Sequence, residues 1–186
     1  VERLRDKADP YRQLLDQASA GHTLIVEKGQ ELRVEDVEEN LVVLMLMIQS
    51  VNRQTKESLK VFMDSGSYSS FFPKDNRYDL HHELLEKVPN LDVFQGINSF
   101  MPQVKTSLGN VLRLTRPLII IDEIHKVFSD KAKETINSLN PSMVVGFSAT
   151  PKAGMNILIS ITGQELKDAG MIKLDMDIMS PRSNED

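Results

Sequence analysis

The stretch Pro117-Leu118-Ile119-Ile120-Ile121-Asp122-Glu123-Ile124-His125 decides the fold. Its short aliphatic run is typical of a strand buried on both faces, in a parallel sheet covered by helices. Ligands of such sheets bind outside the carboxyl ends of the strands, where Asp122 and Glu123 emerge. Two adjacent acids at that edge can hold Mg²⁺ through its coordinated water and activate an attacking water. The alternative is that they only cap the next helix.

A second stretch, Met143-Val144-Val145-Gly146-Phe147-Ser148-Ala149-Thr150-Pro151, is another short apolar run, and it ends in hydroxyl residues. The interval between the two runs leaves room for one helix, over about residues 130–139, as a crossover between parallel strands requires. Ser148 and Thr150 are therefore expected to leave the sheet at the same edge as Asp122.

Together the two stretches resemble motifs of the superfamily 2 helicases and translocases of the DEAD/DEAH type. Asp122-Glu123-Ile124-His125 matches motif II, the Walker B box, and Ser148-Ala149-Thr150 matches motif III. The segment from Thr162 to Lys173 resembles the one that follows motif III in the helicase subunits of type III restriction enzymes. The resemblance implies an α/β fold with a mostly parallel sheet flanked by helices, as in a partial RecA-like domain of the P-loop NTPase type.

The same resemblance implies a function: part of the ATPase motor of a DNA helicase or translocase, in the helicase subunit of a restriction enzyme. Asp122 would hold Mg²⁺ through water, and Glu123 would orient or deprotonate the attacking water. His125 would connect the nucleotide site to Ser148-Ala149-Thr150, which would couple hydrolysis to movement along DNA. ATP and Mg²⁺ are the implied cofactors. DNA is the implied partner of the parent protein, with a DNA methyltransferase or specificity subunit as a further partner.

Leu41 to Ile48 is an unbroken apolar run, which fits a central buried strand, although periodicity alone does not exclude a buried helix. The run ends in a polar set that contains Gln49, Asn52 and Arg53. The Gln-x-x-Asn pattern resembles an element of the restriction-enzyme branch that lies near nucleic acid or the ATP site. The three side chains are therefore candidate nucleic-acid contacts, and capping of the next helix is the alternative.

One part of the family's machinery is missing from this sequence. The phosphate-binding loop Gly-x-x-x-x-Gly-Lys-Ser/Thr, which surrounds phosphates with backbone N–H groups and a lysine, does not occur in the 186 residues. We therefore expect this chain alone to be inactive, and its start at Val1 suggests a piece of something longer. Two alternatives stay open: a non-catalytic docking module with a relic Walker B box, and another Walker B ATPase with its loop upstream. The Ser-Ala-Thr partner argues against the latter.

Composition narrows the class of protein. Hydrophobic residues make up 40% and charged residues 26% of the chain, as is usual in a globular domain. There is no cysteine, which excludes disulfides and thiolate zinc sites. A net charge of −5 offers no overall basic field for nucleic acid, although Lys105, Arg113 and Arg116 form a modest basic cluster. No apolar run is long enough for a membrane span and no signal peptide is visible, so we expect a cytoplasmic protein that is not in a membrane.

The pattern divides the chain into an N-terminal segment (1–40), the second half of a RecA-like domain (41–179) and a tail or linker (180–186). In the first part we expect a helix that starts at Pro10 under an Asp9 cap, then a hairpin-like pair of strands. The remaining expected elements are helices over 55–64, 78–88, 103–114 and 163–169, and strands over 157–161 and 174–179.

Overall fold

The structure is a computed structural model, and it describes residues 2–27, 29–46, 63–94, 101–127, 129–152 and 154–171. The chain forms two compact units, Val1–Thr150 and Pro151–Asp186, each of which is described by itself. The candidate contacts Gln49, Asn52 and Arg53 lie outside the described residues, and so do the expected strand over 174–179, the tail and most of the expected helix over 55–64.

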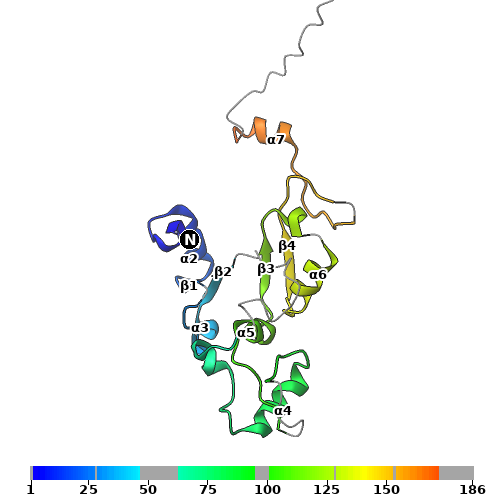
Figure 1. Ribbon diagram of the computed structural model, residues 1–186. Coiled ribbons are helices and arrows are strands. Elements are labelled where there is room, and N and C mark those ends of the chain that lie inside the picture. Colours follow the sequence, from blue (N-terminus) through cyan, green and yellow to red (C-terminus); the bar gives the residue numbers. More distant parts are fainter. Residues whose placement is uncertain are drawn as a thin grey trace, which may run out of the picture. The chain divides into compact units, whose positions relative to one another are not determined.

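Figure 1 follows the helices and strands along the chain. In order they are α1 (Glu2–Arg5), α2 (Pro10–Ala18), β1 (Thr23–Glu27), α3 (Val34–Glu39), β2 (Leu41–Met45), η3 (Gly66–Phe71), α4 (Tyr78–Lys87), α5 (Leu108–Thr115), β3 (Leu118–Ile121), η4 (Ile124–Val127), α6 (Asp130–Asn137), β4 (Met143–Gly146) and α7 (Gly163–Asp168).

The first parallel pair is β1 and β2, joined through α3. Thr23 pairs with Leu41 and Glu27 with Met45, in parallel register. The predicted hairpin is therefore wrong: residues 31–33 are not a strand, and β1 pairs with β2 instead. Gly29 lies in a turn after β1, with φ +88°, but the chain then enters α3 rather than running back along β1.

The second parallel pair is β3 and β4, with α6 as the crossover between them. The register runs from Leu118 opposite Met143 to Ile121 opposite Gly146. Helix α6 starts where expected, because the Ser129 hydroxyl accepts a hydrogen bond from the Ala132 N–H. Parallel strand pairs connected through helices confirm the predicted α/β class.

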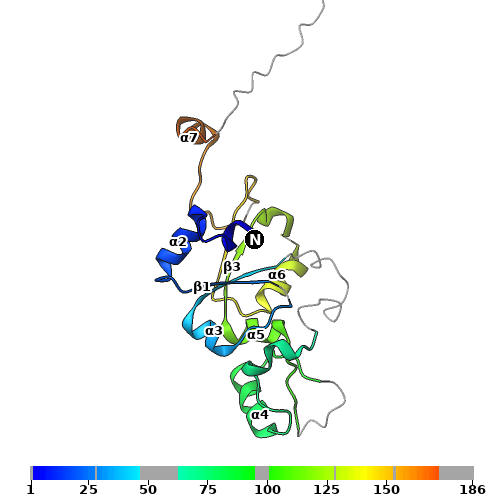
Figure 2. The ribbon, with the colours of Figure 1, turned by 90° about the vertical axis from the view of Figure 1, so that its left-hand side faces the viewer.

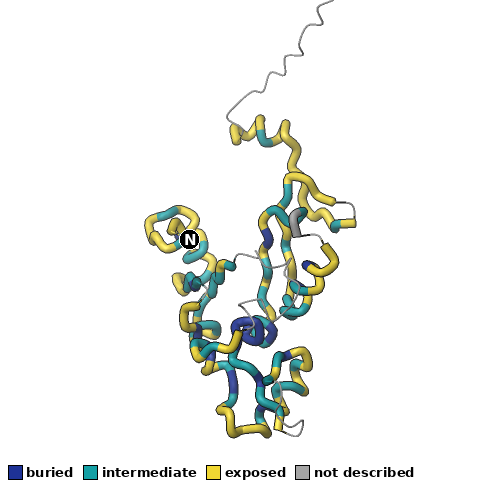
Figure 3. The backbone as a smooth tube through the Cα atoms, viewed as in Figure 1, coloured by how far each residue is buried: buried dark blue, intermediate teal, exposed yellow. Residues whose placement is uncertain are grey.

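The hydrophobic core of the first unit gathers around α5, a helix that Figure 3 shows largely in the colour of buried residues, with no exposed residue. In Figures 1 and 2, α5 lies between β3 and α4. The rings of Tyr68, in η3, and of Phe72, just after it, belong to this core. The buried members of the core are Val26, Leu32, Tyr68, Phe72, Leu91, Val104, Leu108 and Val111.

One face of the β3–β4 pair is open, which corrects the prediction that the motif II strand is buried on both faces. Leu118 and Ile120 are 55% and 63% exposed, whereas Ile121, whose side chain points to the other face, is 5% exposed. The pattern of alternate residues is that of a strand covered on one face only. Among the residues that the structure describes, no element covers the Leu118–Ile120 face.

The predicted helices over 78–88 and 103–114 and the helix expected to start at Pro10 are present, with shifted ends. The Asp9 carboxylate caps α2 by accepting from the Tyr11 N–H at 2.9 Å, and α4 fills its predicted range. Helix α5 begins at Leu108, later than predicted, because the Ser107 hydroxyl caps it there.

In the second unit, the predicted helix is α7, but the predicted strand over 157–161 is wrong. Leu158 and Ile159 are 80% and 81% exposed and have no strand partner among the described residues. A strand gains its stability from a paired neighbour, so β-branched composition alone does not form one. Helix α7 is held by a reciprocal capping box between Thr162 and Glu165.

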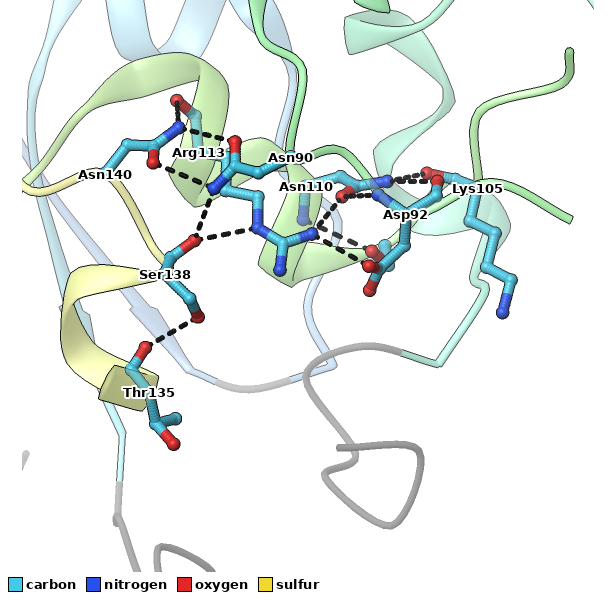
Figure 4. A network of polar contacts seen from close by, with 9 residues as sticks. Asn90, Asp92, Lys105, Asn110, Arg113, Thr135, Ser138 and Asn140 are labelled. Atoms are coloured by element: carbon cyan, nitrogen blue, oxygen red, sulfur yellow. Dashed lines mark hydrogen bonds and ion pairs between the residues drawn. The ribbon is translucent and has the colours of Figure 1, made fainter. Parts of the chain in front are cut away.

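A buried polar network fixes α5 to its neighbours (Figure 4). The Arg113 side chain is fully buried; its Nη1 lies 3.1 Å from Asp92 Oδ1 and donates to Asn110 Oδ1, and its Nε donates to the Ser138 carbonyl. The Asn110 amide bonds both the N–H and the C=O of Asp92. Asn90 and Asn140 form a reciprocal amide pair beside it. The network therefore joins α5, the 90–92 segment and the end of the crossover helix α6.

A surface ion pair at the start of α4 gives a pH prediction. Arg77 donates two hydrogen bonds to Asp79, at 2.7 and 3.0 Å, and the pairing lowers the pKa of Asp79 from 3.8 to about 2. Because the folded pKa lies below the unfolded one, the pair contributes stability above about pH 4 and loses it as the pH falls toward 2. Both side chains are exposed, so this contribution is small.

We expect Arg77→Ala to move the pKa of Asp79 back toward 3.8, as measured by NMR titration of its carboxyl carbon. Arg33→Ala, which removes another exposed arginine from an ion pair with Glu31, should leave the Asp79 titration unchanged. An unaltered titration in Arg77→Ala would mean that the ion pair does not form in solution.

Candidate functional site

The candidate site is built at the carboxyl ends of β3 and β4 by the peptide groups of Phe147. The Phe147 N–H donates to the Ile121 carbonyl at 2.9 Å, and the Phe147 carbonyl accepts from the Ile124 N–H at 3.0 Å. Phe147, which follows β4, thus hydrogen-bonds both Ile121 and Ile124, which lie three residues apart. Asp122 and Glu123 are looped out of the ladder between them, and Glu123 takes a left-handed conformation with φ +52°.

The side chains that flank this loop converge on one imidazole nitrogen. His125 Nδ1 lies 2.8 Å from Ser148 Oγ and 3.1 Å from Glu123 Oε2. The Ser148 hydroxyl oxygen also accepts from the Thr150 N–H at 3.1 Å. A proton on Nδ1 satisfies both of its contacts, because Ser148 and Glu123 then act as acceptors. Motif II and motif III are therefore in direct side-chain contact.

This geometry does not fit a serine hydrolase. In a Ser-His-acid relay the serine and the acid contact opposite nitrogens of the imidazole, so that a proton can pass through the ring. Here Ser148 and Glu123 share Nδ1. The cluster is suited to positioning the carboxylate of Glu123, not to activating the hydroxyl of Ser148.

Asp122 is exposed, and unlike Glu123 its carboxylate makes no hydrogen bond or ion pair with another side chain among the described residues. No group of three or more potential metal ligands occurs in that part of the chain. Mg²⁺ commonly binds through one or two carboxylates, with water and substrate phosphates in its other positions. A single free carboxylate beside Glu123 fits this mode of binding, and it does not fit an all-protein metal site.

The family model for the type III restriction enzyme res subunit matches residues 11–153. The chain belongs to this family. No curated protein and no solved structure gives a significant match. The match extends from α2 to just beyond Thr150, so the looped carboxylates and the Ser148 contact both lie inside it. It confirms the resemblance to superfamily 2 helicases, and it supports the coarse function of the family: the ATP- and Mg²⁺-dependent helicase motor of a restriction enzyme.

In this res-subunit chain, all the predicted motif II and motif III residues lie at the edge of the sheet formed by the carboxyl ends of β3 and β4, which we call the rim. Asp122, Glu123 and His125 follow β3, and Ser148 to Thr150 follow β4, which runs parallel to it. The sequence pattern did not single out Gly146 or Phe147, although both shape the loop. The only sequence signal was a glycine at the end of a strand that is otherwise made of large aliphatic residues.

A cavity of about 560 Å³ lies at the other end of β3 and is lined partly by Lys87, Arg113 and Arg116. The basic cluster expected from the sequence was Lys105, Arg113 and Arg116. Arg113 is buried and ion-paired with Asp92, so these residues do not form a patch of three exposed cations. Lys87 and Arg116 stand at the carboxyl-terminal ends of α4 and α5, where a cation offsets the helix dipole. This arrangement accounts for the cations without a bound anion.

No helix among the described residues is long and apolar enough to cross a membrane.

Proposed function

We propose that this chain is the Walker B and motif III half of a nucleotide-hydrolysing motor that moves on DNA. The observation that carries the proposal is the pair Asp122–Glu123, looped out at the ends of parallel strands beside the His125–Ser148 contact. Family membership supports the same function. Adjacent carboxylates in this place are suited to phosphoryl transfer to water, which depends chiefly on positioning and charge stabilisation.

Each rim residue has a distinct role in the proposal. Asp122 holds Mg²⁺ through a coordinated water, which its exposed carboxylate allows. Glu123 orients or deprotonates the attacking water, and His125 restrains its carboxylate through the 3.1 Å contact. The bond from His125 to Ser148 carries a change at the nucleotide side to motif III, and Thr150 supports Ser148 through its N–H. When bound, Mg²⁺ supplies charge stabilisation to the phosphates.

The DNA contacts of the proposal are on a different segment. Gln49, Asn52 and Arg53 come after β2 in the sequence, and in parallel sheets the polar residues that follow a strand are the usual ligand contacts. Because the chain has a net charge of −5, DNA binding has to be local rather than driven by the overall field. A DNA methyltransferase or specificity subunit is the proposed protein partner of the intact enzyme.

The proposal predicts that this chain alone hydrolyses ATP at background level, because no phosphate loop is present in its sequence. Release of radiolabelled phosphate from ATP, with and without DNA, measures this directly. A Glu123→Gln/His125→Ala variant of the same chain is the matched control. DNA-stimulated turnover well above that control would contradict the prediction, since it would require another way of fixing the phosphates.

A second candidate is a docking module that keeps a relic of the Walker B box, and the missing phosphate loop is the observation that favours it. The coding sequence upstream of Val1 separates the two candidates. A Gly-x-x-x-x-Gly-Lys-Thr there supports the motor, whereas a chain that is complete without it supports the module.

A further inference from the structure

Gly146, the last residue of β4, has no room for a side chain. It pairs with Ile121, the residue before the looped carboxylates. A Cβ atom built on Gly146 would lie 2.4 Å from Cδ1, 2.8 Å from Cγ2 and 2.9 Å from Cβ of Ile124. Such distances do not occur between non-bonded carbon atoms, so the Ile124 side chain occupies the space that any larger residue at 146 would need.

Ile124 is the one apolar residue of the Asp-Glu-Ile-His box, and it is held from two sides. Its backbone N–H donates to the Phe147 carbonyl, and its side chain lies over Gly146. On either side of it are Glu123, in the left-handed conformation, and His125, bonded to Ser148. A left-handed non-glycine residue costs free energy, so neighbouring contacts must hold it in place.

We propose that Ile124 is a positioning residue. Its side chain packs on the backbone of Gly146 and thereby fixes the direction of the Glu123 carboxylate and the His125 imidazole. When a side chain at position 146 takes this space, Ile124 moves away from β4, the hydrogen bonds of Phe147 to Ile121 and Ile124 break, and the His125–Ser148 contact is lost. Its importance for hydrolysis rests on the proposed function, but the geometry itself is testable without nucleotide.

The test uses NMR on this chain and three variants: Gly146→Ala, Ile124→Ala and the double variant. The readouts are the ¹⁵N shift of His125 Nδ1 and the hydrogen-exchange rates of the Ile124 and Phe147 amides. Overpacking a filled site is costly, so in Gly146→Ala we expect exchange of both amides to accelerate about tenfold or more. We also expect the Nδ1 shift to move toward that of a histidine without this hydrogen bond. Gly66→Ala, the same change in open space, should alter neither readout.

The double variant identifies the contact as the cause. Ile124→Ala removes the two side-chain atoms that come closest to the added methyl group, so the double variant should exchange more slowly than Gly146→Ala. If Gly146→Ala does not fold, Ile124→Ala alone tests the proposal, because it removes the packing on Gly146 without adding volume. Unchanged His125 and Phe147 signals in Ile124→Ala, or no recovery in the double variant, would overturn the proposal. Neither result bears on whether the rim hydrolyses ATP.

Discussion

If the proposed motor is completed by a phosphate loop, replacing Glu123 by Gln is expected to reduce its ATP hydrolysis by about a thousandfold or more while nucleotide binding changes little. Glutamine is close to glutamate in size and keeps one acceptor oxygen for His125, so the loop between Ile121 and Ile124 is preserved. It lacks the negative charge and the basicity needed to act on the attacking water. Single-turnover hydrolysis and equilibrium nucleotide binding measure the two effects separately.

Glu134→Gln is the matched control, because Glu134 is an exposed glutamate on the crossover helix α6. It should hydrolyse ATP at the rate of the unmodified protein. If Glu123→Gln weakened binding and turnover by the same factor, Glu123 would belong to the framework of the site and not to its chemistry.

The sequence was sufficient to predict the two parallel strands and the common edge of their polar residues. The aliphatic runs of β3 and β4 and the helix-length interval between them leave few arrangements, and the observed register is one of these. Burial could not be predicted in the same way. Leu118 and Ile120 are as apolar as a fully buried strand requires, but their exposure depends on neighbours that the local pattern does not describe.

Errors elsewhere have the same physical origin. A turn does follow β1, at Gly29, but a turn does not determine whether the chain returns along the same strand or crosses through a helix. The strand expected over residues 157–161 has the right composition and no described partner. In each case the local signal was correct and the non-local contact decided the structure.

The candidate site was predictable in its residue types and not in its geometry. Spacing brings Asp122 and Ser148 to one edge, whereas the Phe147 bridge depends on two hydrogen bonds between segments far apart in sequence. The shared use of His125 Nδ1 by Ser148 and Glu123 also follows only from coordinates. Arg113 shows the limit clearly: its sequence context suggested a surface cation, but its partner Asp92 makes it a buried ion pair.

We expect Arg113→Met to lower the free energy of unfolding by about 3 kcal/mol. Removing the guanidinium takes the 3.1 Å ion-pair contact from the Asp92 carboxylate. It also takes away one of the two donors to the Asn110 Oδ1 and one of the two donors to the Ser138 carbonyl. Breaking a buried ion pair costs about 3–5 kcal/mol, and we take the lower end because Asp92 is still 23% exposed to water. Urea unfolding followed by circular dichroism measures the change.

Arg116→Met is the matched control, since Arg116 is exposed just beyond the end of the same helix, and its cost should stay within about 0.5 kcal/mol. A double variant, Arg113→Met with Asp92→Asn, should recover about 1 kcal/mol, because it removes the unpaired charge. Equal stabilities of Arg113→Met and Arg116→Met would show that the network in Figure 4 does not hold α5 against the crossover helix.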